Sequence, residues 1–136
     1  MASWLVKTEP NQYSYRDLEA DGTAEWDGVA NPVAQRHMRE MREGDACVIY
    51  HSGAERSAVG LARVVRGPYP DPTDPRGKRV WVDLRAERRF GQSVSLATLK
   101  AEAAFAGSPL VRVPRLSVMP LDDQQLAVIE RLALER

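Results

Sequence analysis

The chain has 136 residues, which is enough for one domain with a single core and too few for two comfortable ones. Hydrophobic residues make up 43% of the chain and charged residues 28%, a balance that excludes a mostly disordered protein. Lysine plus arginine equals aspartate plus glutamate, 19 each, so net charge gives no argument for a nucleic-acid partner.

The charges are unevenly distributed along the chain. Residues 1–30 hold two bases and six acids, whereas residues 63–90 hold eight bases and four acids. A neutral sum can hide one basic face, and a phosphate backbone would be attracted to such a face. A solvated arginine-rich surface explains the same pattern, and charge alone favours that simpler interpretation.

Three further features bear on compartment and cofactors. No apolar run approaches the ~20 residues that span a bilayer, and the opening MASWLVKTEP lacks the basic and apolar regions of a secretory signal. Cys47 is the only cysteine, and no cysteine–histidine cluster has zinc spacing. We therefore expect a cytoplasmic protein with no membrane contact, no metal and no cofactor, in which Cys47 is a small buried residue.

In the first half of the chain, cap residues and hydrophobic periodicity predict two strands and two helices. The segment EWDGVANP shows no regular period, so Trp26 is expected in a polar loop. The expected elements are a strand at 3–6, a helix from Ser14 through Leu18, a helix from Asn31-Pro32 that Gly44 closes, and a strand at 45–51.

The second half predicts more strands, separated by prolines and by short helices. The four prolines and two glycines of residues 67–77 predict a loop. Strands are expected at 58–65 and 79–85, a helix after Ser95, an extended segment at 110–118 and a helix capped by Asp122 with Gln125. Strict βαβ alternation is absent, so these elements favour the α+β class and a small, strongly bent mixed barrel with flanking short helices.

The stretch VIYHSG at 48–53 raises the question of catalysis. His51 and Ser52 are adjacent on a strand and therefore point to opposite faces, and no G-x-S-x-G motif presents a serine. Cys47 would lie about 13 Å from His51 at ~3.3 Å per residue, too far for a dyad. We accordingly assign no catalytic residue here, and a structural or solvent-facing role is the default for His51.

Three other places carry candidate chemistry. Lys7, Thr8 and Glu9 follow the first strand, and a buried lysine can act as a base or nucleophile, although a solvated strand end explains them more simply. Trp26 is either core or a stacking plate for a planar ligand. Asn31 could complement a base edge, unless capping the following helix already occupies its side chain.

Several fragments occur in one order: SWLVKTEP, EWDGVAN, the helix closing at Met41-x-x-Gly44-Asp45, VIYHSG and PLVRVPRLSVMPL. Together they resemble an EVE domain, a family of the PUA-like superfamily, from Ser3 to about Leu132. The resemblance implies a single domain over 1–136, a PUA-like mixed β pseudo-barrel with flanking short helices, and a pocket for a flipped, modified base. Ala30 departs from the family form, which commonly has an arginine there beside the pocket.

The resemblance also implies a function and a partner. We expect a monomeric, non-enzymatic module that binds DNA or RNA carrying a modified base, in particular a modified cytosine. One alternative is a small amidohydrolase acting on a modified nucleoside, as in related ASCH-type domains, which would use Lys7, Thr8 and Glu9. A third possibility, which the neutral net charge supports, is a small-molecule or protein-interaction module that kept only the fold. The implied base pocket comprises Lys7, Thr8, Trp26, Val29, Asn31, His51, Ser52, Arg115, Leu116 and Ser117. The nucleic-acid backbone would be tracked by Arg63, Arg66, Arg79, Arg88 and Arg89.

Overall fold

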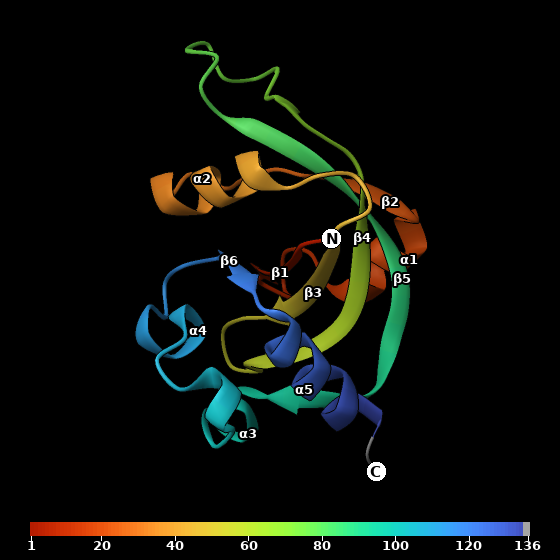
Figure 1. Cartoon of the computed structure of the whole chain (residues 1–136). Helices are drawn as coiled ribbons and strands as arrows, with labels where there is room; N and C mark the ends of the chain where they lie inside the picture. The colour runs from red at the N-terminus through yellow and green to blue at the C-terminus, as the bar shows by residue number, and fades with distance from the viewer. Residues whose placement is uncertain (135–136) are drawn as a thin grey trace.

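The computed structural model describes residues 1–134 and is built on a mixed sheet of six strands, in the spatial order β2-β5-β4-β3-β1-β6 (Figure 1). Short helices cover its flanks, so the expected α+β pseudo-barrel is confirmed. The last two residues of the expected 1–136 domain lie outside the described residues.

The strands are β1 (Ser3–Thr8), β2 (Thr23–Trp26), β3 (Ala46–His51), β4 (Ser57–Pro70), β5 (Val80–Ser95) and β6 (Val118–Leu121). The helices are α1 (Tyr15–Asp21), α2 (Pro32–Glu40), α3 (Leu96–Lys100), α4 (Pro109–Arg112) and α5 (Asp123–Leu134), with a 3₁₀ turn at Ala103–Phe105.

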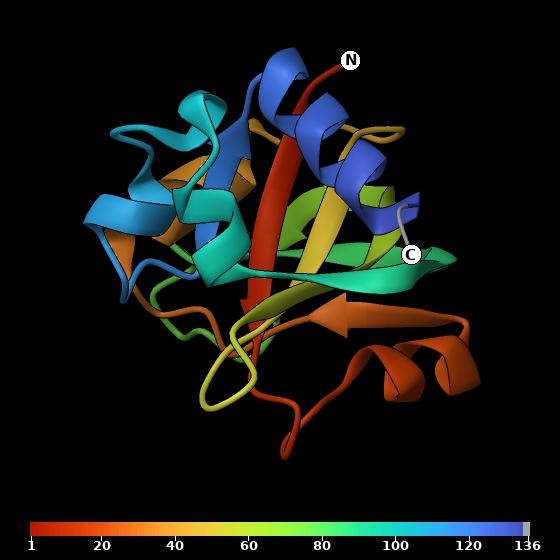
Figure 2. The ribbon, with the colours of Figure 1, turned by 90° about the horizontal axis from the view of Figure 1, so that it is seen from below.

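Strands β1 and β3 form a parallel pair that runs through the middle of the molecule (Figure 2). All six residues of β3 are buried, as are the first four of β1. Strands covered on both faces are expected to be continuously apolar, and SWLV and ACVIY fit that rule. Cys47 is fully buried in this pair, as predicted.

Strands β4 and β5 are long, and four register shifts between them bend the sheet strongly. Strand β4 continues through Gly67–Pro70 and pairs there with β5, so the prediction of a loop at 67–77 is wrong in its first part. The prolines are tolerated because β3 pairs with β4 only as far as Arg63, which leaves this stretch at a sheet edge. The remaining loop spans residues 71–79.

The helix caps expected from the sequence are present. Ser14 and Asp17 form a capping box on α1, and Asn31 with Pro32 begins α2. At the start of α5, the Gln125 backbone N–H donates to the Asp122 carboxylate at 2.7 Å, and the Asp122 backbone N–H donates to Gln125 Oε1 at 2.9 Å. Each cap depends on contacts within four residues, which is why a sequence pattern can reveal it.

Two predicted boundaries are wrong. Helix α2 ends at Glu40, and Gly44 instead forms the turn into β3 with a positive φ of 94°. The segment 110–118, expected to be extended, begins as helix α4 with Pro109 at its first position. In residues 1–134, no helix has the length and apolar character needed to cross a bilayer.

Candidate functional site

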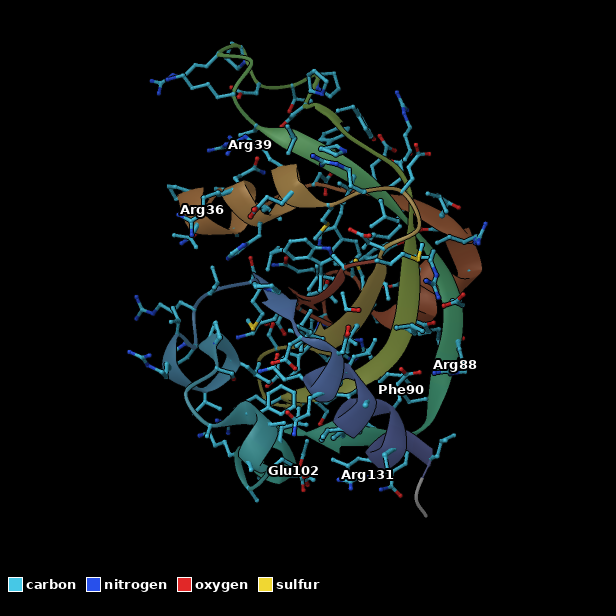
Figure 3. All side chains as sticks on the ribbon, viewed as in Figure 1. Arg36, Arg39, Arg88, Phe90, Glu102 and Arg131 are labelled. Atoms are coloured by element: carbon cyan, nitrogen blue, oxygen red, sulfur yellow. The ribbon has the colours of Figure 1, made fainter. Side chains whose placement is uncertain are left out.

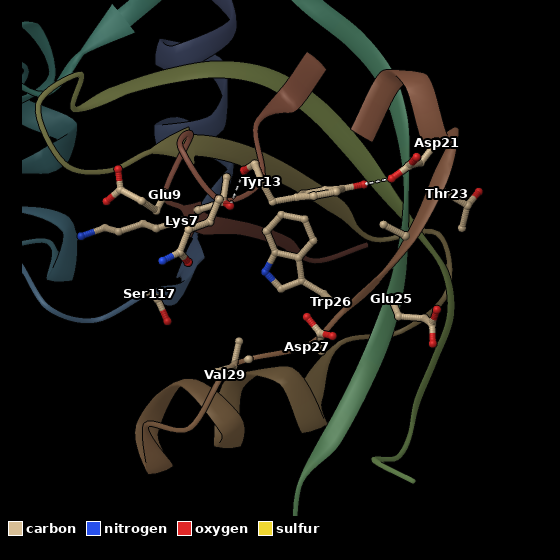
Figure 4. A pocket seen from close by; sticks show the side chains of 14 residues that line it. Lys7, Glu9, Tyr13, Asp21, Thr23, Glu25, Trp26, Asp27, Val29 and Ser117 are labelled. Atoms are coloured by element: carbon tan, nitrogen blue, oxygen red, sulfur yellow. Dashed lines mark hydrogen bonds between the residues drawn. The ribbon is translucent and has the colours of Figure 1, made fainter. Parts of the chain in front are cut away.

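A cavity of about 610 Å³ opens where the two edges of the bent sheet approach each other (Figure 4). One edge contributes the end of β2 and its connection to α2. The other contributes the end of β1, which neighbours β6, together with the loop before α1. The lining residues are Lys7, Thr8, Glu9, Gln12, Tyr13, Asp21, Thr23, Ala24, Glu25, Trp26, Asp27, Gly28, Val29 and Ser117.

Lys7 lies at the end of β1, where the strand still pairs with the segment before β6. Its backbone N–H donates to the Ser117 carbonyl at 2.8 Å, and its Nζ donates to the Pro114 carbonyl at 2.8 Å. The ammonium also lies 5.4 Å from the centre of the Tyr50 ring. Burial lowers the pKa of Lys7, because the neutral partners on this side do not compensate fully for lost hydration.

Tyr13 forms the wall opposite the β2–α2 connection. The Thr8 hydroxyl donates to the Tyr13 carbonyl at 2.6 Å, and the Tyr13 hydroxyl donates to Asp21 at 2.7 Å. Burial, followed by this bond to the Asp21 carboxylate, raises the pKa of the Tyr13 phenol. Thr8 and Asp21 therefore hold Tyr13 at both ends and fix the wall of the cavity.

Trp26 is the last residue of β2 and pairs with Val82 of β5, so the expectation of a polar loop at this position is wrong. Its side chain is part of the core and only 7% exposed. The Tyr13 ring meets it in an edge-on arrangement, with centroids 6.1 Å apart and planes at 80°. The cavity nevertheless borders the indole, so Trp26 is both a core residue and a wall of the site.

The cavity wall is predominantly acidic. Four carboxylates line it, from Glu9, Asp21, Glu25 and Asp27, against the single ammonium of Lys7. The acid-rich first 30 residues of the sequence supply all four of them. Such a wall favours neutral or amino-bearing ligands over phosphate groups.

Five of the ten expected pocket residues line this cavity: Lys7, Thr8, Trp26, Val29 and Ser117. Thr8 and Glu9 line it together with Lys7, although consecutive residues of a strand point alternately to opposite faces. Strand β1 ends at Thr8, so Glu9 no longer follows the alternation.

The other five expected residues do not line the Trp26 cavity. Asn31 is an N-cap, because its Oδ1 accepts from the backbone N–H of Val33 at 2.9 Å and of Ala34 at 3.1 Å. The Ser52 hydroxyl donates to the Thr8 carbonyl at 3.3 Å, just behind the cavity wall. Leu116 is buried in the core, whereas Arg115 is exposed.

His51 lies instead in a second cavity of about 460 Å³, between the start of α1 and the far end of the β4–β5 pair. The side chain is buried, and both ring nitrogens have partners. Its Nε2 accepts from the Tyr15 backbone N–H at 3.0 Å, and its Nδ1 lies 2.9 Å from the Glu55 carboxylate. The geometry supports a structural role for His51.

The arginines expected to contact the nucleic-acid backbone are mostly engaged within the chain. Arg63 pairs with Glu87 at 2.7 Å, Arg88 pairs with Glu130 of α5 at 2.9 Å, and Arg89 forms an ion pair with Glu19. Arg66 stacks over Tyr69, with 4.0 Å from Cζ to the ring centre, and Arg79 is exposed at the end of the 71–79 loop. On α2, Arg36 is exposed, whereas the Arg39 guanidinium donates to the Lys78 carbonyl at 2.6 Å (Figure 3).

Nine of the lining residues were not among the pocket residues expected from the sequence. Asp27 and Gly28 directly follow Trp26 in the chain, so only their place beside it could have been expected from the sequence. The others come together through the pairing of distant strands. Within residues 1–134, no group of three or more histidine, cysteine, aspartate or glutamate side chains is arranged to hold a metal.

Comparison with known proteins places this geometry in context. The family model described as "EVE domain" matches residues 2–132. Human thymocyte nuclear protein 1 is 32% identical over 166 aligned positions, which cover 97% of this chain and 73% of the human protein. An NMR structure of a Rhodopseudomonas palustris protein, 39% identical, superposes with a TM-score of 0.93 over 100% of this chain and 97% of its own. The crystal structure of human THYN1 in complex with 5-methylcytosine-containing DNA superposes with a TM-score of 0.89 at 26% identity, covering 100% of this chain and 99% of that one.

Proposed function

Because the chain belongs to the EVE domain family, we propose that it binds DNA or RNA carrying a modified base and holds a modified cytosine in the cavity beside Trp26. The observation that carries this proposal is the cavity itself. Its volume of about 610 Å³ lies within the ~300–1,000 Å³ typical of small-ligand sites. The complex of human THYN1 with 5-methylcytosine-containing DNA supports the choice of ligand.

Two contributions determine the free energy with which such a protein binds its base: the cost of extracting the base and the gain from its contacts with the cavity wall. Taking a base out of its stack costs a few kcal/mol, and the cost is least when the strand is already open. Contact with Trp26, Tyr13 and Val29 offsets part of that cost by removing apolar surface from water. The polar wall then discriminates, since an ill-matched base leaves a buried donor or acceptor unpaired.

The test is a binding titration by fluorescence anisotropy with labelled single-stranded and duplex oligonucleotides, in DNA and RNA form. Each probe carries either one 5-methylcytosine or an unmodified cytosine. Val29→Trp places a bulky ring in the cavity from a half-buried position and should abolish the preference for the modified probe. Trp26→Ala should do the same, and Trp81→Ala is its control, because Trp81 packs on Tyr69 outside the cavity.

Trp26 is buried, so its truncation is expected to cost stability of about 3–5 kcal/mol, and circular dichroism must show that the variant is folded. Val29→Trp avoids this difficulty because it removes no core residue. Equal affinity of the wild type for both probes, or an undiminished preference in folded Val29→Trp, would contradict the proposal.

One observation supports the alternative of a small amidohydrolase: Lys7, Thr8 and Glu9 all line the cavity. Lys7 Nζ and the Thr8 hydroxyl, however, both donate to backbone carbonyls of the chain, at 2.8 and 2.6 Å. A nucleophile or base would first have to leave these partners. Turnover of an N4-acylated cytidine that Lys7→Ala abolishes would favour the enzyme over the reader.

A further inference from the structure

Trp26 is only 7% exposed, so little of its indole is open to a stacked base. The six-membered ring of the indole points toward the Tyr13 ring, with the two planes at 80° (Figure 4). The indole nitrogen points away from Asp21 toward the side of the cavity formed by Lys7 and Ser117 (Figure 4). The indole N–H is therefore within reach of a ligand in the cavity.

This N–H has no hydrogen-bond partner within residues 1–134. The contrast is Trp4, whose Nε1–H donates to the buried Asp45 carboxylate at 3.0 Å. A bound ligand displaces the water around this N–H. If the ligand offers no acceptor in return, the N–H loses the free energy of its hydration, and binding is weakened. The Trp26 indole therefore requires an acceptor on the ligand.

The carboxylate of Asp27 lies beside the indole (Figure 4) and receives no hydrogen bond from residues 1–134. The other acids near Trp26 are less suited to accept from a ligand, because Asp21 already accepts from Tyr13 and Glu25 points away from the indole. An ionised carboxylate accepts hydrogen bonds and cannot donate them. The Asp27 carboxylate therefore requires a donor on the ligand.

We infer that Asp27 accepts a hydrogen bond from the exocyclic amino group of a cytosine-type base, while the Trp26 Nε1–H donates to an acceptor on the same ring. This inference deepens the proposed function and rests on it. Cytosine presents an amino donor next to ring acceptors, and aspartate is a suitable partner for that amino group. Thymine, which places a carbonyl oxygen there, would oppose the carboxylate with a second acceptor.

The test compares two oligonucleotides that differ at one position, 5-methylcytosine in one and thymine in the other. Both bases carry the same methyl group, so the comparison isolates the amino group from the carbonyl. The wild type should bind the 5-methylcytosine probe more tightly by roughly 5- to 150-fold, the range of one well-placed base contact. Asp27→Asn should reduce this ratio to near unity, because an amide can also donate to the thymine oxygen.

Glu43→Gln is the matched control, since it removes the same charge from an exposed side chain in the turn before β3, outside the cavity. It should leave the ratio unchanged. Both side chains are exposed, so neither change is expected to affect folding. Intact mass spectrometry verifies that the new amide, which precedes Gly28, has not deamidated.

A second measurement tests the indole. Replacing Trp26 with its benzothiophene analogue, in which sulfur takes the place of N–H, keeps the shape of the ring and should weaken binding of the 5-methylcytosine probe by roughly 2- to 10-fold. The inference is overturned if Asp27→Asn and Glu43→Gln change the ratio equally, or if the analogue binds as the wild type does. The proposed function survives that result provided that 5-methylcytosine is still preferred over unmodified cytosine. Absence of that preference in the wild type overturns both.

Discussion

His51 Nε2 accepts the backbone N–H of Tyr15 at 3.0 Å and thereby joins the end of β3 to the start of α1. Accepting at Nε2 places the ring proton on Nδ1, which then donates to Glu55 at 2.9 Å. The segment that this bond anchors also carries Tyr13, one wall of the Trp26 cavity. His51 thus acts on the cavity indirectly, by fixing the chain that lines it.

Replacing His51 with alanine should lower the free energy of unfolding by about 1–3 kcal/mol, because the buried Tyr15 N–H would lose its acceptor. Urea denaturation of the two proteins measures the difference. Ser52→Ala is the control, since its long 3.3 Å bond to a backbone carbonyl is half-exposed. Unchanged stability of His51→Ala combined with lost oligonucleotide binding would instead make His51 a ligand contact.

Gly60 is required by the Tyr15 ring. A Cβ added at Gly60 would lie 2.5 Å from two ring carbons, and the Tyr15 hydroxyl is tied to the Leu61 carbonyl at 2.8 Å, so the ring has little freedom to move. Gly60→Ala should therefore destabilise the fold by about 1–3 kcal/mol through overpacking.

The matched control is Gly91→Ala on β5, where the nearest atom to the new Cβ would be 3.6 Å away, an ordinary contact. Thermal unfolding followed by circular dichroism compares the two substitutions. Similar changes in both would show that the Tyr15 ring yields, and that the glycine at position 60 serves another purpose.

Local signals in the sequence predict the parts of the fold that depend on local contacts. Ser14, Asn31 and Asp122 are recognisable as caps because each bonds to a backbone N–H two or three residues away. The same reasoning fails at Gly67–Pro70, where the prolines predict the end of a strand. This stretch has a free edge because β3 pairs with β4 only as far as Arg63, and the extent of that pairing is not a local property of the sequence.

The candidate site is half predictable for the same reason. Trp26 and Lys7 follow from the family resemblance, and the structure brings both to one cavity. The carboxylates of Asp21 and Asp27 resemble ordinary turn residues, because nothing within their own segments shows that the two sheet edges meet there. From the sequence, Asn31 could either cap helix α2 or contact a base edge. In the structure its side chain accepts from the backbone N–H groups of Val33 and Ala34, so it caps the helix.

Stability at high pH should depend on Tyr69. Burial and the hydrogen bond that its hydroxyl donates to Asp83 raise the pKa of Tyr69 from 10.0 to about 12. A raised pKa favours the protonated phenol in the folded state, so its contribution to stability is complete below pH 10 and is lost as the pH rises through about 12.

The free energy of unfolding should therefore fall between these two values, and it should fall less steeply in Tyr69→Phe. Urea titrations of both proteins at several pH values across this interval measure the difference. Identical slopes would mean that the phenol ionises alike in the folded and unfolded chains. Neutral-pH circular dichroism of Tyr69→Phe controls for a general loss of structure.

The salt dependence of binding should identify the cations that meet phosphate. Arg112 and Arg115 are exposed and form no ion pair within residues 1–134, and their segment is joined to the cavity by the bond from Lys7 to Pro114 and by Ser117. Arg63 and Arg88 are already paired with glutamates, so a phosphate would have to displace a carboxylate.

Each of Arg112→Ala and Arg115→Ala should reduce the slope of log K against log salt by about 0.7–0.9, whereas Arg63→Ala and Arg88→Ala should leave it nearly unchanged. Anisotropy titrations of one 5-methylcytosine probe over a series of salt concentrations give the slopes. A reversed pattern would place the phosphates along β4 and β5, on the arginine-rich strands that the charge distribution of the sequence indicates.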